Sequence, residues 1–119
     1  MQTHAVTILN FDDIVEKNEI VLLDFWATWC QPCKILGPVF EEMAKHNTDI
    51  FFGKVDTEES KELAGAFQVR SVPTLMAFKK GELVFEQSGL PTPAQLEQLL
   101  HNLRNLESAP IGMEEEPQS

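Results

Sequence analysis

The sequence has little that would bind an anionic partner or cross a membrane. Nine lysines and arginines stand against nineteen aspartates and glutamates, so the formal net charge is −10. This charge argues against nucleic acid or an anionic membrane surface as a partner. No apolar run approaches the roughly 20 residues of a membrane helix. The beginning, from Met1 to Ala5, lacks the basic and apolar regions of a signal peptide, so we expect a cytoplasmic protein.

Cysteine is equally scarce, since the 119 residues include only Cys30 and Cys33. A disulfide between them would close a loop of four residues, and so short a loop adds little stability in the chain-entropy model. Secreted domains that are held together by disulfides also use more cysteines than this. The pair is therefore not expected to be a structural staple, and its close spacing needs another explanation.

Length and composition indicate one folded domain over residues 1–106 and a separate tail over residues 107–119. The tail has four acidic residues, no basic residue and two prolines, which is typical of a disordered segment. Without its four negative charges, the net charge falls from −10 to −6. We expect a solvated, disordered tail, with an acidic contact segment as the alternative interpretation.

Strand and helix patterns alternate along the folded part. Residues 20–27 are almost entirely apolar, as in a central strand that is buried on both faces. The other expected strands cover residues 5–9, 50–55, 74–78 and 83–87. Helices are expected after an Asn10 cap, over residues 33–46 with a kink at Pro38, over residues 60–67, and after Thr92.

The C-terminal part of the domain has the clearest signals. Residues 92–95, Thr-Pro-Ala-Gln, combine a capping box with proline at the first helical position, and a stripe of leucines follows. Residues 74–78 and 83–87 are joined so closely that they must form an antiparallel pair. The whole order predicts an α/β fold, with a mixed sheet of about five strands and helices on both faces.

Cys30 and Cys33 lie where a buried strand gives way to a helix. The unpaired N–H groups and positive dipole at a helix N-terminus favour an anion, here the Cys30 thiolate, which is the nucleophile of disulfide exchange. Pro32 restricts the turn and withholds one N–H group. We therefore expect Cys30 to be the more exposed, attacking thiol, and Cys33 to be the shielded, resolving thiol.

Two other interpretations of the cysteine pair compete with a redox role. A structural zinc site needs four ligands, and the chain has no further cysteine and only scattered histidines, so we expect no metal. Two inert buried cysteines remain the second alternative, although inert thiols do not require a Cys-x-x-Cys turn at a helix start. A redox pair is the favoured interpretation, and no cofactor is expected.

Three segments of the chain form a distinctive set: DFWATWCQPCK at residues 24–34, VRSVPT at residues 69–74 and KKG at residues 79–81. In this order they resemble the thioredoxin family. The resemblance extends over about residues 5–106 in one order. It implies the thioredoxin fold, a central five-stranded mixed sheet with four helices, and reversible disulfide reduction through Cys30 and Cys33.

The resemblance also assigns roles around the two thiols. Asp24 is the only charged residue of its apolar strand, so burial should raise its pKa and allow it to exchange a proton with Cys33, although a purely structural aspartate is the alternative. Pro73 matches the family's cis-proline, which would present the Val72 backbone to an extended substrate segment. The substrate surface would comprise Trp29, Gln31, Pro32, Val72 and Gly89. Trp26 is at least as well explained by packing.

Two positions depart from the family pattern. Gln31 stands where glycine is most familiar, and changes between the cysteines shift the stability of dithiol relative to disulfide, so we expect a shifted but still reducing potential. A lysine often lies four residues before the acidic residue that ends the third strand, and counting back from Asp56 gives Phe52. Either Lys54 replaces that lysine, or Asp24 lacks a cationic neighbour.

The favoured function is a thiol–disulfide oxidoreductase that reduces protein disulfides, acts as a monomer and receives electrons from a thioredoxin reductase. An oxidase or isomerase is a second possibility, disfavoured because no signal peptide is visible. The alternative of another class is a binding module or co-chaperone that uses the groove with little turnover.

Overall fold

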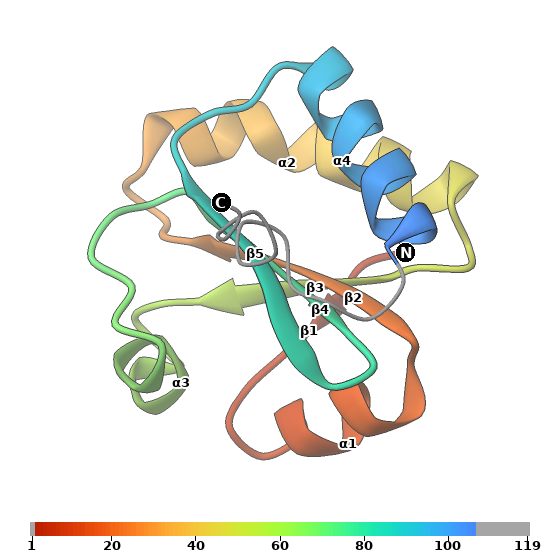
Figure 1. Cartoon of the computed structure of the whole chain (residues 1–119). Coiled ribbons are helices and arrows are strands. Elements are labelled where there is room, and N and C mark those ends of the chain that lie inside the picture. The colour runs from red at the N-terminus through yellow and green to blue at the C-terminus, as the bar shows by residue number, and fades with distance from the viewer. Residues whose placement is uncertain (1, 107–119) are drawn as a thin grey trace, which may run out of the picture.

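The computed structural model describes residues 2–106 and forms an α/β fold (Figure 1). Five strands and four helices follow one another in the order β-α-β-α-β-α-β-β-α within that range. Their bounds are β1 His4–Ala5, α1 Phe11–Lys17, β2 Ile20–Trp26, α2 Gln31–His46, β3 Phe51–Asp56, α3 Lys61–Ala66, β4 Thr74–Lys79, β5 Glu82–Ser88 and α4 Pro93–Asn105. The predicted order is therefore confirmed, and the predicted tail over residues 107–119 lies outside the described residues.

The strands form one mixed sheet in the order β1-β3-β2-β4-β5. β1, β3 and β2 are mutually parallel, whereas β4 runs antiparallel to both β2 and β5. β4 and β5 are joined through Lys80 and Gly81, both with positive φ, as a tight hairpin between antiparallel strands requires. The central position of β2 agrees with its apolar sequence, since six of its seven residues are buried.

The sheet separates two hydrophobic cores because successive side chains of a strand point to opposite faces. Leu22 of β2 belongs to the core beneath α2 and α4, and Leu23 belongs to the core on the opposite face, where Ile14 of α1 and Leu63 of α3 pack. Figure 1 shows the two helix pairs on opposite faces of the sheet. Each fully buried side chain of this size contributes about 1.5–3 kcal/mol.

Helix α4 matches its prediction closely. The Thr92 side chain accepts a hydrogen bond from the Gln95 N–H, and the Gln95 side chain accepts one from the Thr92 N–H, which completes the capping box. The leucine stripe then faces the sheet. Its buried members are Leu96, Leu99, Leu100 and Leu103.

The first strand differs from its prediction. β1 contains only His4 and Ala5, because the chain turns at Thr7, whose N–H donates to Asn10 Oδ1 at 2.8 Å. The expected strand residue Leu9 consequently lies in the turn and is 92% exposed. Asn10 precedes α1 as predicted, but its side chain makes no capping bond to the helix. β-branched composition alone did not reveal this local competition between strand and turn.

Helix α2 runs from Gln31 to His46 and continues through Pro38, so the kink expected there stays a prediction. In the described part of the chain, no helix is both long and apolar enough to cross a membrane.

Candidate redox site

Cys30 and Cys33 form a disulfide at the junction of β2 and α2. Their Cα atoms are 5.3 Å apart. Cys30 is the N-cap of α2, and its sulfur accepts a hydrogen bond from the Cys33 N–H at 3.2 Å. Helix N-termini stabilise negative charge through such N–H groups and the helix dipole. The cap position therefore suits a Cys30 thiolate once the disulfide is reduced.

The expected difference in exposure between the two cysteines is wrong for the disulfide form. Cys30 is 3% exposed and Cys33 is 5% exposed. Both are covered because Ala27 is buried against them and the half-buried Trp26 and Val72 pack on the same cluster. The feature that distinguishes the two sulfurs is instead their place on α2, since Cys30 lies at its cap and Cys33 within its first turn.

A second segment reaches the disulfide from the start of β4. The peptide bond between Val72 and Pro73 is cis, as the resemblance implied, and Val72 packs against the cysteine cluster. The Pro73 carbonyl accepts a hydrogen bond from the Gly89 N–H at 2.9 Å. Gly89 has a φ of +102°, a conformation that favours glycine. The structure therefore brings Val72, Pro73 and Gly89 together beside the thiol pair.

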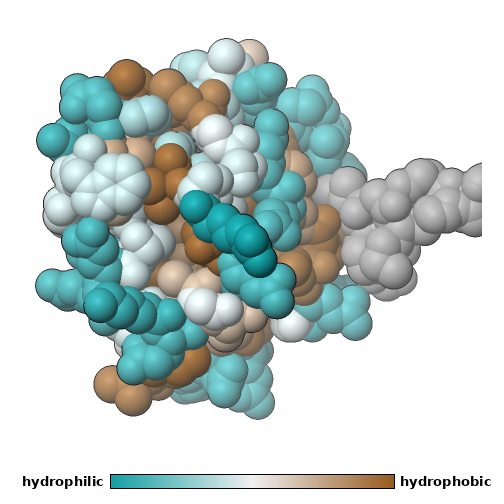
Figure 2. All heavy atoms as spheres, turned by 90° about the vertical axis from the view of Figure 1, so that its left-hand side faces the viewer, coloured by the Kyte–Doolittle hydropathy of each residue, from teal (hydrophilic) through white to brown (hydrophobic). Residues whose placement is uncertain are grey.

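Exposed side chains surround this end of the molecule. Trp29 is 68% exposed, and Gln31 and Pro32 are also exposed. Figure 2 shows this face, where hydrophobic and weakly polar side chains interrupt a largely hydrophilic surface. The Trp29 indole N–H donates to Glu58 at 2.8 Å. Glu58 was missed by the sequence analysis, because a contact between residues 29 positions apart has no local signal.

Asp24 is fully buried in the middle of β2, on the face that α2 covers. Neither of its carboxyl oxygens has a hydrogen-bond partner within residues 2–106. Burial raises the pKa of Asp24 from 3.8 to about 7, and the positive charge of Lys54 acts in the opposite direction. The predicted rise in pKa is confirmed, and the carboxyl can exchange protons near neutral pH.

The cationic neighbour of Asp24 is Lys54. The parallel register of β2 and β3 places Lys54 directly opposite Asp24, and its ammonium lies 5.1 Å from the centre of the Trp26 ring. Phe52 is instead buried in the core, edge-on to Phe40. The possibility that Asp24 lacks a cationic neighbour is therefore wrong, because strand register rather than the count from Asp56 decides which side chain faces it.

Within residues 2–106, no three His, Cys, Asp or Glu side chains are placed to hold a metal ion together. The site contains two neighbouring sulfurs at a helix N-terminus and a buried carboxyl whose pKa is about 7, and exposed side chains surround it. Such an arrangement can exchange disulfides with another thiol pair.

Comparison with known proteins agrees with this chemistry. The thioredoxin family model matches residues 2–102. A putative thioredoxin 2 of Streptomyces coelicolor is 49% identical over 105 residues, which cover 88% of this chain and 78% of that protein. A thioredoxin of Mycoplasmoides gallisepticum is 37% identical over 97 residues, which cover 82% of this chain and 97% of that protein.

Comparison with solved structures also leads to thioredoxins. The structure of a mutant thioredoxin from Halobacterium salinarum superposes with a TM-score of 0.82 at 40% identity, covering 88% of this chain and 93% of that one. These likenesses span both the cysteine pair and the sheet that positions it. The chain belongs to the thioredoxin family and is a thiol–disulfide oxidoreductase, with disulfide-containing proteins as its substrates and thioredoxin reductase as its family's redox partner.

Proposed function

We propose that the protein reduces protein disulfides, with Cys30 as the attacking and Cys33 as the resolving thiol. The observation that supports these roles is the Cys30 sulfur at the cap of α2, where it accepts the Cys33 N–H. In the dithiol form, the Cys30 thiolate attacks one substrate sulfur, forms a mixed disulfide and displaces the other substrate sulfur as a thiolate. Cys33 then attacks Cys30, which restores the Cys30–Cys33 disulfide and releases the second substrate thiolate.

Asp24 is the proposed proton acceptor for Cys33 in the second step. Its raised pKa of about 7 allows it to take up the thiol proton and to return it near neutral pH. The balance of the reaction is simple: two electrons and two protons pass from the two cysteines to the substrate disulfide. A thioredoxin reductase then supplies the same equivalents to the Cys30–Cys33 disulfide.

The substrate segment is proposed to lie extended along Val72. The contact of the half-buried Val72 with the cysteine cluster supports this placement, because a backbone segment next to the reacting sulfur can pair with another extended chain. The exposed Trp29, Gln31 and Pro32, together with Gly89, would form the rest of the contact surface. We further propose a monomer in the cytoplasm, where a reducing compartment keeps the dithiol form available.

The two thiol roles are tested by Cys33→Ser. Without the resolving thiol, the mixed disulfide between Cys30 and its substrate cannot be released, so a Cys33→Ser protein should accumulate covalent adducts in a cell extract. Non-reducing gel electrophoresis followed by reduction identifies the trapped chains. Cys30→Ser is the matched control and should trap nothing. Equal adduct yields from both variants would contradict the assigned order of attack.

A second candidate function is a binding module or co-chaperone with little turnover. An insulin reduction assay with dithiothreitol separates it from a reductase. A reductase accelerates the precipitation of the released insulin chain, whereas a module that only binds does not. Failure of the wild-type protein to accelerate precipitation would reject the proposed reductase function.

A further inference from the structure

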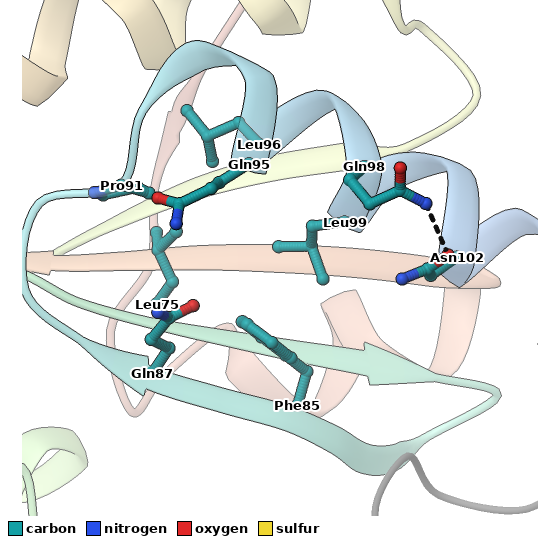
Figure 3. Close-up of a pocket in the computed structure, with 9 residues that line it drawn as sticks. All are labelled: Leu75, Phe85, Gln87, Pro91, Gln95, Leu96, Gln98, Leu99 and Asn102. Carbon is teal, nitrogen blue, oxygen red and sulfur yellow. Dashed lines mark hydrogen bonds between the residues drawn. The ribbon is translucent and has the colours of Figure 1, made fainter.

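The groove between α4 and the edge of the sheet has no role in the disulfide chemistry described above. It has a volume of about 190 Å³. Leu75 of β4, Phe85 of β5 and Leu99 of α4 lie along its floor (Figure 3). An apolar floor that is open to solvent favours the burial of another apolar group.

The rim of the groove is made of side-chain amides. Gln87 of β5 and Gln95 of α4 lie at one end, and Gln98 donates to Asn102 at 3.0 Å toward the other. No charged side chain of residues 2–106 lines this groove, although the whole chain has a net charge of −10. Amides offer both donors and acceptors, so the groove suits the neutral backbone and apolar side chains of a polypeptide.

The groove begins next to the redox site. Pro91 lines its first part and follows Gly89 by two residues, and the Gly89 N–H is bonded to Pro73 beside the disulfide. From Pro93 to Asn102, α4 rises by roughly 14 Å, which four or five extended residues can span. A protein substrate must continue beyond its reacting cysteine, so one arm of its chain can pass Gly89 and enter the groove.

We propose that this groove is an exosite for the disulfide-bearing substrate itself. It binds an uncharged, apolar-rich segment of the substrate chain that lies several residues from the reacting cysteine. This inference rests on the proposed function, because it assigns a second contact to the same substrate. Its contribution is to binding rather than to chemistry, so it should change KM and leave kcat unchanged.

The test uses three disulfide peptides with the same reacting core. One is the core alone, and the other two carry an uncharged apolar extension of about eight residues at the N-terminal or the C-terminal side. Eight extended residues span roughly 26 Å, enough to pass Gly89 and fill the groove. For the wild-type protein, we expect one extension to lower KM by about tenfold relative to the core, which corresponds to roughly 1.4 kcal/mol of binding.

The decisive variant is Gln98→Lys, which places a charge on the rim without changing the capping box. It should lose the gain from the extension and reduce the core peptide as the wild type does. Asn105→Lys, on the same helix but outside the groove, is the matched control and should keep the gain. A gain that survives Gln98→Lys, or the absence of a gain with either extension, would overturn the exosite.

Other occupants give different results. A gain that disappears as the enzyme concentration rises would assign the groove to a second copy, and one that requires deletion of residues 107–119 would assign it to the chain's own tail; either result overturns the proposal. Failure to reduce even the core peptide would reject the proposed function. Reduction of the core without benefit from an extension would reject only the exosite.

Discussion

At the scale of single residues, Asp24 is the group whose energetics are most clearly visible. Its carboxyl is completely buried and has no hydrogen-bond partner within residues 2–106, an arrangement that opposes ionisation. The sequence was sufficient to predict this, because one aspartate interrupts an apolar strand. It was not sufficient to identify Lys54 as the cationic neighbour, because that depends on the register between β2 and β3.

The raised pKa of Asp24 predicts that stability falls as pH rises. The folded protein retains the proton up to a pKa of about 7, whereas the unfolded chain loses it near 3.8. Between these values the folded state binds more protons, so the free energy of unfolding decreases with pH, by a total on the order of 4 kcal/mol. Urea unfolding should show that Asp24→Asn removes most of this slope and stabilises the protein at pH 8.

Glu97→Gln on the exposed face of α4 is the control for that measurement. It removes one carboxylate from the surface and should leave the slope between pH 4 and pH 7 unchanged. An Asp24→Asn protein with the same pH dependence as the wild type would mean that Asp24 is already ionised in the folded state.

At the scale of elements, the features set by residues close together in sequence could be predicted, whereas those that depend on long-range contacts could not. The residues that begin α4 are adjacent in sequence, so the capping box correctly predicted where the helix starts. The end of the same helix has no such signal, because Lys79 of β4 reaches it from 24 residues away. The buried Lys79 ammonium donates to the carbonyls of Leu103, Arg104 and Leu106. It thereby supplies donors at the end of the helix, where the last carbonyls have no partner in a following turn, although the Leu103 carbonyl also accepts the Leu106 N–H.

Replacing Lys79 by methionine should therefore destabilise the end of α4. The variant keeps an apolar stem of similar length but leaves these carbonyls without their donor, at a cost of about 1–3 kcal/mol in the free energy of unfolding. Hydrogen exchange should accelerate in the last turn of α4. Lys80→Met is the matched control, because Lys80 is exposed in the turn that follows, and it should alter neither quantity. Unchanged protection in Lys79→Met would show that the ammonium contributes nothing to the helix end.

At the scale of the whole molecule, topology rather than sequence proximity assembles the redox site. Cys30 follows β2, Pro73 precedes β4 and Gly89 follows β5, yet the pairings between these strands bring all three to one end of the sheet. The antiparallel direction of β4 is what allows the start of that strand to meet the end of β2. The family resemblance of the motifs was enough to predict which residues belong to the site. Their contacts could not be predicted in this way, because the pairing of the strands determines them.

The C-terminal end of the folded part predicts where the chain can be shortened. The nine elements and the two cores described above lie within residues 2–106, and residues 107–119 carry four of the acidic charges. A chain ending at Leu106 should keep its disulfide reductase activity and its free energy of unfolding within about 0.5 kcal/mol.

A chain that ends at Asn102 supplies the contrast, because it also loses Leu103, which is fully buried, and the carbonyls that Lys79 contacts. Loss of a buried leucine side chain alone costs about 2–5 kcal/mol, so urea unfolding should separate the two truncated chains clearly. A comparable loss in the chain that ends at Leu106 would place the domain boundary beyond residue 106. The two truncations thus test whether the domain ends at Leu106, where the contacts of Lys79 stop and the acidic segment begins.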